Sequence, residues 1–352
     1  MDWIATFGLN YGLFLAKTLT LVAAFAVIVI LIASSAMNVK REKNRRLSVE
    51  RVNDRLERMG DTLSDALLNG AEKKARAKQR KQEAKQKAKA EKLGKKHAPQ
   101  RLFVLDFDGD IRASAVEGLR ESINALLQVT EAEDEVLLRL ESGGGMVHSY
   151  GLAASQLTRL RDAGVHLTVA VDRVAASGGY MMACVGDRIV AAPFAIIGSI
   201  GVVAQMPNFN RWLGDKHIDF EMHTAGDYKR TLTLFGENTE TGRQKFREEL
   251  EDTHGLFKQF VAQHRRAVDI DSVATGEHWY GSQALDKQLV DEVSTSDDLM
   301  LAAARDGRDV FTVAIRQPRG VLARLGGQAS RLMARTVHEQ GLSRAEIGAR
   351  RY

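Results

Sequence analysis

Ser177 lies in a short segment that suits a reactive hydroxyl. We expect HLTVAVD (residues 166–172) to be a strand, AASGGY (175–180) a tight turn, and YMMACV (180–185) the start of a helix. A serine at such a turn can expose its Oγ, and the N–H of Gly178 would point from the positive end of a helix toward an oxyanion. The alternative is that Ser177 only caps the helix, which is a common role for serine.

Three consecutive glycines follow another expected strand. Gly143, Gly144 and Gly145 come after EVLLRLES (135–142). A helix expected at 147–161 follows, with Leu152, Leu157 and Leu160 facing inward. Glycines there leave backbone N–H groups free to face a ligand. No Gly-Lys-Ser/Thr follows the run, which argues against a phosphate-binding loop. A donor site for an oxyanion and a simple strand-to-helix turn both remain open.

A serine nucleophile also needs a base. We interpret six histidines in scattered polar contexts as surface or structural residues: His148, His217, His223, His254, His264 and His278. A lysine can replace histidine where burial lowers its pKa. Lys229 stands in the loop GDYKRT, after an expected strand HIDFEMH (217–223), but its position alone indicates a surface lysine.

Metal-binding patterns are absent from the sequence. There is no HExxH motif and no paired Cys/His spacing, and Cys184 is the only cysteine, so neither an intramolecular disulfide nor a cysteine-only metal site can form. We therefore expect no metal and no other cofactor.

From Arg101 onward, expected strands alternate with helices. Further strands are expected at 101–109, in DRIVAAP (187–193) and in IIGSIGVV (196–203). Further helices are expected after a capping box of Ser114 and Glu117, at 240–265, and in a small closing element at 273–293. Alternation of this kind predicts an α/β domain with a mostly parallel, covered sheet. Residues 189–206 lack charge, but their proline, glycines and β-branched residues favour buried strands over a membrane span.

The N-terminal region predicts a membrane anchor. Residues 18–39 are uncharged and lie between Lys17 and Lys40; as a helix they would span about 33 Å, enough for a bilayer core. A cleaved signal peptide is the alternative, but Asp2 and the length of the apolar run argue against it. The basic residues that follow place the C-terminal side in the cytoplasm by the positive-inside rule.

Charge is segregated along the chain. Residues 38–100 carry 20 Lys and Arg against nine Asp and Glu, residues 101–300 carry 19 against 31, and residues 301–352 carry 10 against four. The net charge of +5 therefore does not indicate a nucleic-acid-binding protein. Residues 71–96 are low in complexity, and we interpret them as a charged spacer rather than a site for anionic lipid or RNA. The expected division is an anchor (1–39), a basic linker (40–100), a folded domain (101–300) and a basic extension (301–352).

Four pieces of sequence, in this order, resemble the signal peptide peptidase A (protease IV) family of membrane-bound serine peptidases, especially its half-length bacterial members. They are SGGGMV from Ser142, VAASGGYMMA around Ser177, GSIGV at Ser199 and GDYKR around Lys229. One departure is that Glu141-Ser142-Gly143-Gly144-Gly145 stands where the family usually has Asn-Ser-Pro-Gly-Gly. Loss of the proline makes this loop less rigid.

The resemblance implies a ClpP/crotonase-like fold of repeated strand–strand–helix units. It implies Ser177 as nucleophile, Lys229 as general base, Gly178 and Gly144 as oxyanion-hole donors, and Ser199 as the group that orients the lysine. It also implies a homo-oligomer in which a neighbouring subunit supplies the base. The expected substrates are remnant signal peptides or unfolded, hydrophobic polypeptides, cleaved without a cofactor.

The resemblance also places the protein in the bacterial inner membrane, through residues 18–39. Relatives that clear exported signal peptides favour a peptidase domain on the far side, against the charge pattern, so the side stays open. Two other functions remain as alternatives. One is a crotonase-like enzyme that acts on a coenzyme A thioester with the same glycine N–H groups, and the other is a catalytically silent membrane scaffold.

Overall fold

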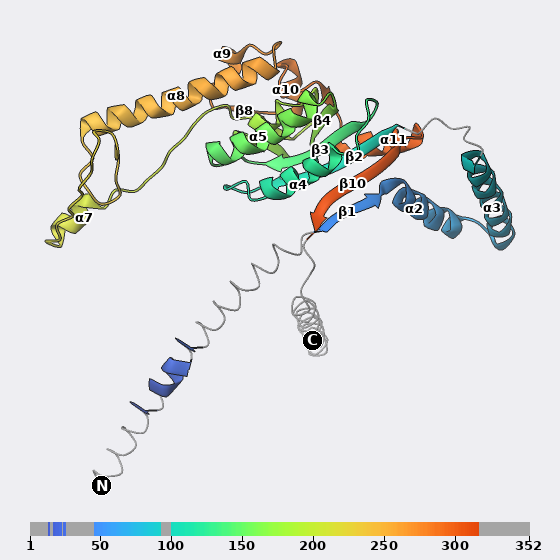
Figure 1. Ribbon diagram of the computed structural model, residues 1–352, viewed down its shortest axis with the longest axis horizontal. Coiled ribbons are helices and arrows are strands. Elements are labelled where there is room, and N and C mark those ends of the chain that lie inside the picture. Colours follow the sequence, from blue (N-terminus) through green and yellow to red (C-terminus); the bar gives the residue numbers. More distant parts are fainter. Residues whose placement is uncertain (1–12, 15–16, 23, 26–45, 93–99, 317–352) are drawn as a thin grey trace, which may run out of the picture. The chain divides into compact units, whose positions relative to one another are not determined.

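The computed structural model describes residues 13–14, 17–22, 24–25, 46–92 and 100–316 (Figure 1). Residues 48–314 form one compact unit, which extends beyond the expected domain of 101–300 at both ends. Most of the expected membrane span at 18–39, and the chain after residue 316, lie outside the described residues. Among the residues that are described, no helix has both the length and the apolar character needed to cross a bilayer.

One ten-stranded sheet contains the strands of the described residues. Its main path runs β1-β10-β2-β3-β4-β6-β9, and the neighbours from β10 to β9 pair in parallel. The short strands β5 and β7 continue from the end of β3 and lead to β8, which is antiparallel to β7. The strands are β1 (Arg46–Arg51), β2 (Arg101–Gly109), β3 (Glu135–Ser142), β4 (His166–Val171), β5 (Val174–Ala176), β6 (Arg188–Ala191), β7 (Ile196–Gly198), β8 (His278–Tyr280), β9 (Glu292–Val293) and β10 (Asp309–Arg316).

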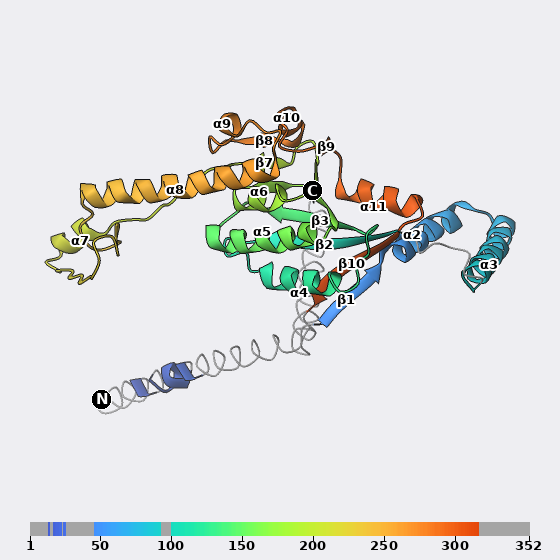
Figure 2. The same cartoon turned by 45° about the horizontal axis from the view of Figure 1, so that its top comes forward.

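Helices cover both faces of this sheet (Figure 2). They are α2 (Val52–Leu67), α3 (Gly70–Lys92), α4 (Val116–Leu126), α5 (Val147–Asp162), α6 (Gly178–Ala183), α7 (Asn210–Asp215), α8 (Glu240–His264), α9 (Ile270–Val273), α10 (Gly281–Asp286) and α11 (Ser296–Arg305). The arrangement confirms the expected α/β class and the mostly parallel sheet.

Alternation of side chains along the strands explains why both faces are apolar. On one face, Phe103, Leu105 and Phe107 of β2 belong to a large core with residues of α4, α5, α6 and α8. On the other face, Leu102 and Val104 join a smaller core with residues of α2 and α11. The parallel strands therefore consist of nearly continuous apolar runs, as expected for a sheet that is covered on both sides.

Three local expectations were wrong. Ser114 does not cap α4, because its N–H and its Oγ both donate to Asp110 and the helix starts at Val116. Residues 217–223 do not form a strand, since they are exposed and no neighbouring strand pairs with them among the described residues. Leu152 of α5 is exposed, whereas Leu157 and Leu160 are buried as expected.

Candidate active site

Ser177 occupies a strained turn between β5 and α6. Its backbone has φ +53° and ψ −120°, a combination that costs a non-glycine residue about 1–3 kcal/mol. The turn is fixed on both sides, because the Ser177 N–H donates to the carbonyl of Gly198 (2.8 Å) and the Ser177 carbonyl accepts from the N–H of Met181 (2.9 Å). The turn holds Ser177 at the N-terminus of α6, where it is only partly buried.

Gly178 follows Ser177 as the first residue of α6. A helix leaves the N–H of its first residue without an intrahelical acceptor, so this group is suited to an anion. No described residue accepts a hydrogen bond from it. The Ser177 Oγ and the Gly178 N–H are thus adjacent and share the positive end of one helix.

Gly144 packs directly against this turn. Its φ is +88°, and a Cβ on Gly144 would lie 2.7 Å from the nitrogen of Gly178 and 2.8 Å from the Ser177 Cβ. Only glycine fits a site with both a positive φ and such close backbone contact. The N–H of Gly144 donates to the Oγ of Ser142 (3.0 Å), so this group is not a free donor in the described structure.

A cavity of about 1000 Å³ opens in front of Ser177. Backbone and small side chains form one part of its wall, from the glycine run and from Gly178 and Ser199. Apolar side chains form another part, among them Met181, Val202 and Phe257. A peptide backbone could approach the hydroxyl over the glycines while a side chain of the substrate contacts the apolar wall.

Ser199 lies in the turn that supports Ser177. It lines the cavity, has φ +52°, and donates its N–H to the carbonyl of Glu277 (2.7 Å). The preceding residue, Gly198, has φ +100° and supplies the carbonyl that accepts the Ser177 N–H. Ser177, Gly178, Gly144 and Ser199, four of the five site residues expected from sequence, therefore surround one cavity.

Helix α8 contributes cavity residues that the sequence did not indicate, among them His254, which we interpreted as surface or structural. Thr253, His254 and Phe257 line the cavity, and they share a helix face with the buried Val261. The ring Nε2 of His254 lies 3.2 Å from the carbonyl of Ile200, so His254 joins α8 to the segment after Ser199. Phe257 stands four residues after Thr253, three after His254 and four before Val261, and this helical spacing is the signal that would have identified the face.

Lys229, the fifth expected residue, is not at the cavity in a single chain. Its neighbour Tyr228 lies under the ammonium group of Lys245, near the N-terminal end of α8. Thr253, the first residue of α8 that lines the cavity, is eight residues further along, about 12 Å at 1.5 Å per residue. Lys229 is exposed and does not line the cavity within the described part of the chain. Its role as a base therefore stays a prediction.

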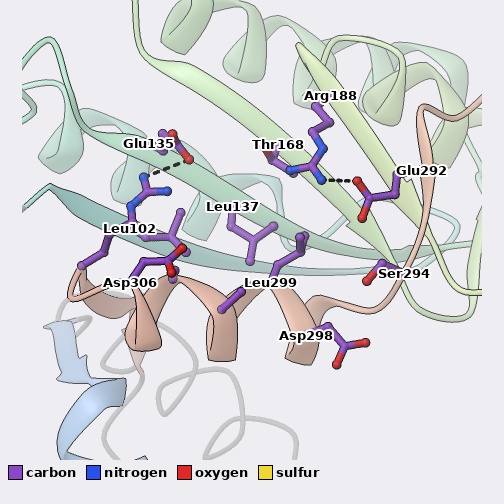
Figure 3. A pocket seen from close by; sticks show the side chains of 13 residues that line it. Leu102, Glu135, Leu137, Thr168, Arg188, Glu292, Ser294, Asp298, Leu299 and Asp306 are labelled. Carbon is purple, nitrogen blue, oxygen red and sulfur yellow. Dashed lines mark hydrogen bonds and ion pairs between the residues drawn. The ribbon is translucent and has the colours of Figure 1, made fainter.

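A second cavity, of about 340 Å³, lies between the sheet and α11 (Figure 3). Its two arginines form ion pairs, Arg308 with Glu135 at 2.9 Å and Arg188 with Glu292. The serine in its wall, Ser294, follows β9 and does not stand at the start of a helix beside a glycine run. The Ser177 cavity is therefore the better candidate for chemistry.

Comparisons with known proteins match this chain to peptidases. The model of peptidase family S49 N-terminal matches residues 6–157, and the model of peptidase family S49 matches residues 159–310. The "Probable protease SohB" of Haemophilus influenzae is 50% identical over 336 residues, which cover 94% of this chain and 95% of that protein. The protein of the same name from Buchnera aphidicola of Acyrthosiphon pisum is 55% identical over 296 residues, 84% of this chain and 86% of that protein. "Protease 4" of Haemophilus influenzae is 24% identical over 220 residues, 59% of this chain and 35% of that protein.

Proposed function

Because the chain belongs to peptidase family S49 and is a serine-type peptidase, we propose that Ser177 is its nucleophile and Lys229, from a neighbouring copy of the chain, its general base. The observation that carries the proposal is the strained turn of Ser177 at the start of α6, which faces a cavity beside glycine backbone. The family relationship favours peptide hydrolysis over the thioester chemistry that similar N–H groups could support.

The reaction is acyl transfer in two steps. Neutral Lys229 takes the proton of Ser177 while the Oγ bonds to the carbonyl carbon of the peptide, whose π electrons move to the oxygen. The oxyanion accepts hydrogen bonds from Gly178 N–H and from Gly144 N–H, which would be shared between the oxyanion and the Ser142 Oγ that it already contacts. The C–N bond then breaks as Lys229 returns the proton to the leaving amine, and water hydrolyses the acyl-enzyme.

A second copy of the chain would complete this site. Residues 208–239, which we name the arm, carry Lys229 and expose large apolar side chains, including Trp212 (58% exposed) and Tyr228 (58%). The arm contacts the N-terminal part of α8, where Tyr228 meets Lys245. Exposed apolar surface of this kind is typical of a protein interface. In a homo-oligomer the arm would bury Lys229 against a neighbour's Ser177, with Ser199 orienting the amine.

The strand pattern supports a ClpP/crotonase-like fold. β4 and β6 lie on the main path of the sheet, and each is followed by a short strand, β5 or β7, that lies off this path. This gives a repeated strand–strand unit, and α6 follows the first pair directly. The nucleophile then stands where the short strand of one unit meets its helix.

The substrates would be unfolded or hydrophobic polypeptides at a membrane, such as remnant signal peptides. Met181, Val202 and Phe257 give the cavity an apolar wall that suits apolar side chains. We expect residues 18–39, which carry no charge, to anchor the chain in the bacterial inner membrane.

Two inactive variants test the proposal with purified full-length protein. Ser177→Ala and Lys229→Ala should each lose peptide cleavage and keep the far-UV circular dichroism of the wild type. Mixed after dissociation and reassembly, the two variants should regain part of the activity, because some sites would then combine an intact serine with an intact lysine. Cleavage by Ser177→Ala would remove Ser177 from the chemistry, and a confirmed mixed oligomer without activity would exclude a base supplied across the interface.

A further inference from the structure

A buried chain of hydrogen bonds connects the glycine run to the end of β2. Gly144 N–H donates to the Oγ of Ser142 (3.0 Å), which lies 2.5 Å from the hydroxyl of Tyr150. The Tyr150 hydroxyl lies 2.8 Å from the carbonyl oxygen of Asp110. A carbonyl only accepts, so Tyr150 must donate to Asp110, and Ser142 must donate to Tyr150. The direction of hydrogen-bond donation is therefore fixed: Gly144 donates to Ser142, Ser142 to Tyr150, and Tyr150 to Asp110.

The ring of Tyr150 also contacts the turn that follows the nucleophile. A Cβ on Gly178 would lie 2.5 Å from the Tyr150 Cγ and 2.8 Å from its Cδ2. Gly109 has no space for a Cβ either, because the Oγ of Ser142 and the hydroxyl of Tyr150 occupy it. A Cβ on Gly179 would collide with the Ser142 carbonyl oxygen. The absence of side chains at these three glycines thus makes room for Ser142 and Tyr150.

Tyr150 is placed to set the relative position of two backbone segments. Its ring supports Gly178, and its hydroxyl holds Ser142, which holds Gly144. The side chain is fully buried, and burial raises the pKa of its phenol, so the donating proton stays in place at neutral pH. Gly144 and Gly178 are also in contact with each other, since a Cβ on Gly144 would meet the Gly178 nitrogen.

We propose that Tyr150 and Ser142 are positioning residues that hold the glycine run and Gly178 at the separation an oxyanion requires. The inference rests on the proposed function, because it assigns the oxyanion to this place. An oxyanion site depends on donors that are fixed before the reaction, and a displacement near 1 Å can cost about a hundredfold in rate. Neither side chain contacts the substrate, and both act through the backbone.

The test compares Tyr150→Phe with Tyr180→Phe in the full-length protein. Tyr180 is also fully buried, and its hydroxyl also donates to a carbonyl, that of Leu289 at 2.8 Å. Each variant loses a buried hydroxyl that donates to a backbone carbonyl, so the two should lose similar thermal stability. We expect kcat to fall about tenfold in Tyr150→Phe with KM within twofold, and to stay within twofold in Tyr180→Phe.

Two further measurements separate positioning from general stability. Ser142→Ala should lower kcat as much as Tyr150→Phe, and the double variant should lower it no further, because either change breaks the same chain. The hydroxyl of a catalytic serine adds to the carbonyl carbon of a peptide aldehyde, and the former carbonyl oxygen becomes an oxyanion. Such an aldehyde should bind about tenfold more weakly to each variant. The matching peptide alcohol should bind them as it binds the wild type.

The outcomes also distinguish this inference from the proposed function. In one case the wild type cleaves peptides, Ser177→Ala does not, and the kcat of Tyr150→Phe equals that of Tyr180→Phe. That result would refute the positioning role of Tyr150 and leave Ser177 as the nucleophile. If Ser177→Ala still cleaves, the proposed function fails. Hydrogen exchange of the backbone amides of residues 142–146 tests the chain of hydrogen bonds itself. Tyr150→Phe should accelerate this exchange, and an unchanged exchange rate would show that the chain does not restrain the glycine run.

Discussion

Replacing Gly144 by alanine tests the close packing of the glycine run against the nucleophile. The added Cβ would lie 2.7 Å from the Gly178 nitrogen and 2.8 Å from both the Ala176 oxygen and the Ser177 Cβ. Ordinary contacts of this kind lie near about 3.5 Å, so the two segments would have to separate by about 0.8 Å. None of these atoms can rotate away, because two belong to the backbone and the third is the Cβ fixed to it.

The expected cost of Gly144→Ala has two parts. The positive φ of +88° costs alanine about 1–2 kcal/mol, and the overpacking costs about 1–3 kcal/mol more. A separation of nearly 1 Å at an oxyanion site should lower kcat/KM about a hundredfold. The assays are the cleavage rate of a fluorogenic peptide and the free energy of unfolding from urea titration.

Gly164→Ala is the matched control for Gly144→Ala. Gly164 has a similar φ of +79°, but a Cβ there would meet nothing within 4 Å. Gly164 lies in the turn after α5 and does not line the cavity. The Gly164→Ala variant should therefore lose only about 1–2 kcal/mol of unfolding free energy and keep its activity. If Gly144→Ala kept kcat/KM within threefold of Gly164→Ala, contact between the glycine run and the Ser177 turn would not be what positions the reacting groups.

Two other predictions concern stability. Ser177→Gly should be more stable to urea than Ser177→Ala by about 1 kcal/mol, because glycine tolerates a φ of +53°; equal stability would show that the turn is not strained. Asp134→Asn should lose about 2–3 kcal/mol at pH 7. Burial disfavours the charge of Asp134, but hydrogen bonds from Arg101 and from Glu131 N–H outweigh it and lower its pKa. A carboxyl whose pKa is lower in the folded protein stabilises the fold at pH values above its unfolded pKa of about 3.9, and this stabilisation is lost as the pH falls below that value. The difference in urea midpoint between wild type and Asp134→Asn should therefore shrink as the pH falls from 5 toward 3. A constant difference would contradict this account.

Runs of apolar residues were enough to predict the buried strands. The expected strands at 101–109, 135–142 and 166–172 match β2, β3 and β4 to within one residue. The long helix expected at 240–265 corresponds to α8. Such segments are determined by their own residues, because a strand covered on both faces must be apolar throughout and a long amphipathic helix must repeat every 3.6 residues.

Features that depend on a partner elsewhere in the chain were not predictable from local patterns. Ser114 had the sequence of a helix cap, yet Asp110 competes for it and binds both its N–H and its Oγ. Residues 217–223 had the composition of a strand, but a strand forms only where another strand can accept its hydrogen bonds. Tyr150 and His254 reach the site through contacts with residues 40 and 54 positions away, Asp110 and Ile200.

The proposed nucleophile and the proposed base have different structural requirements, and these requirements explain why Ser177 lies in a fixed turn and Lys229 in an exposed segment. A serine with φ +53° keeps that conformation only where its surroundings determine it, and Ser177 is held by the Gly198 carbonyl and by α6 at the edge of the main core. A lysine needs no special backbone to act as a base, but it must be removed from water. An exposed segment that becomes buried on assembly meets that need. If the proposed dyad is correct, the single chain holds a positioned hydroxyl without a competent base, and hydrolysis begins only when copies assemble.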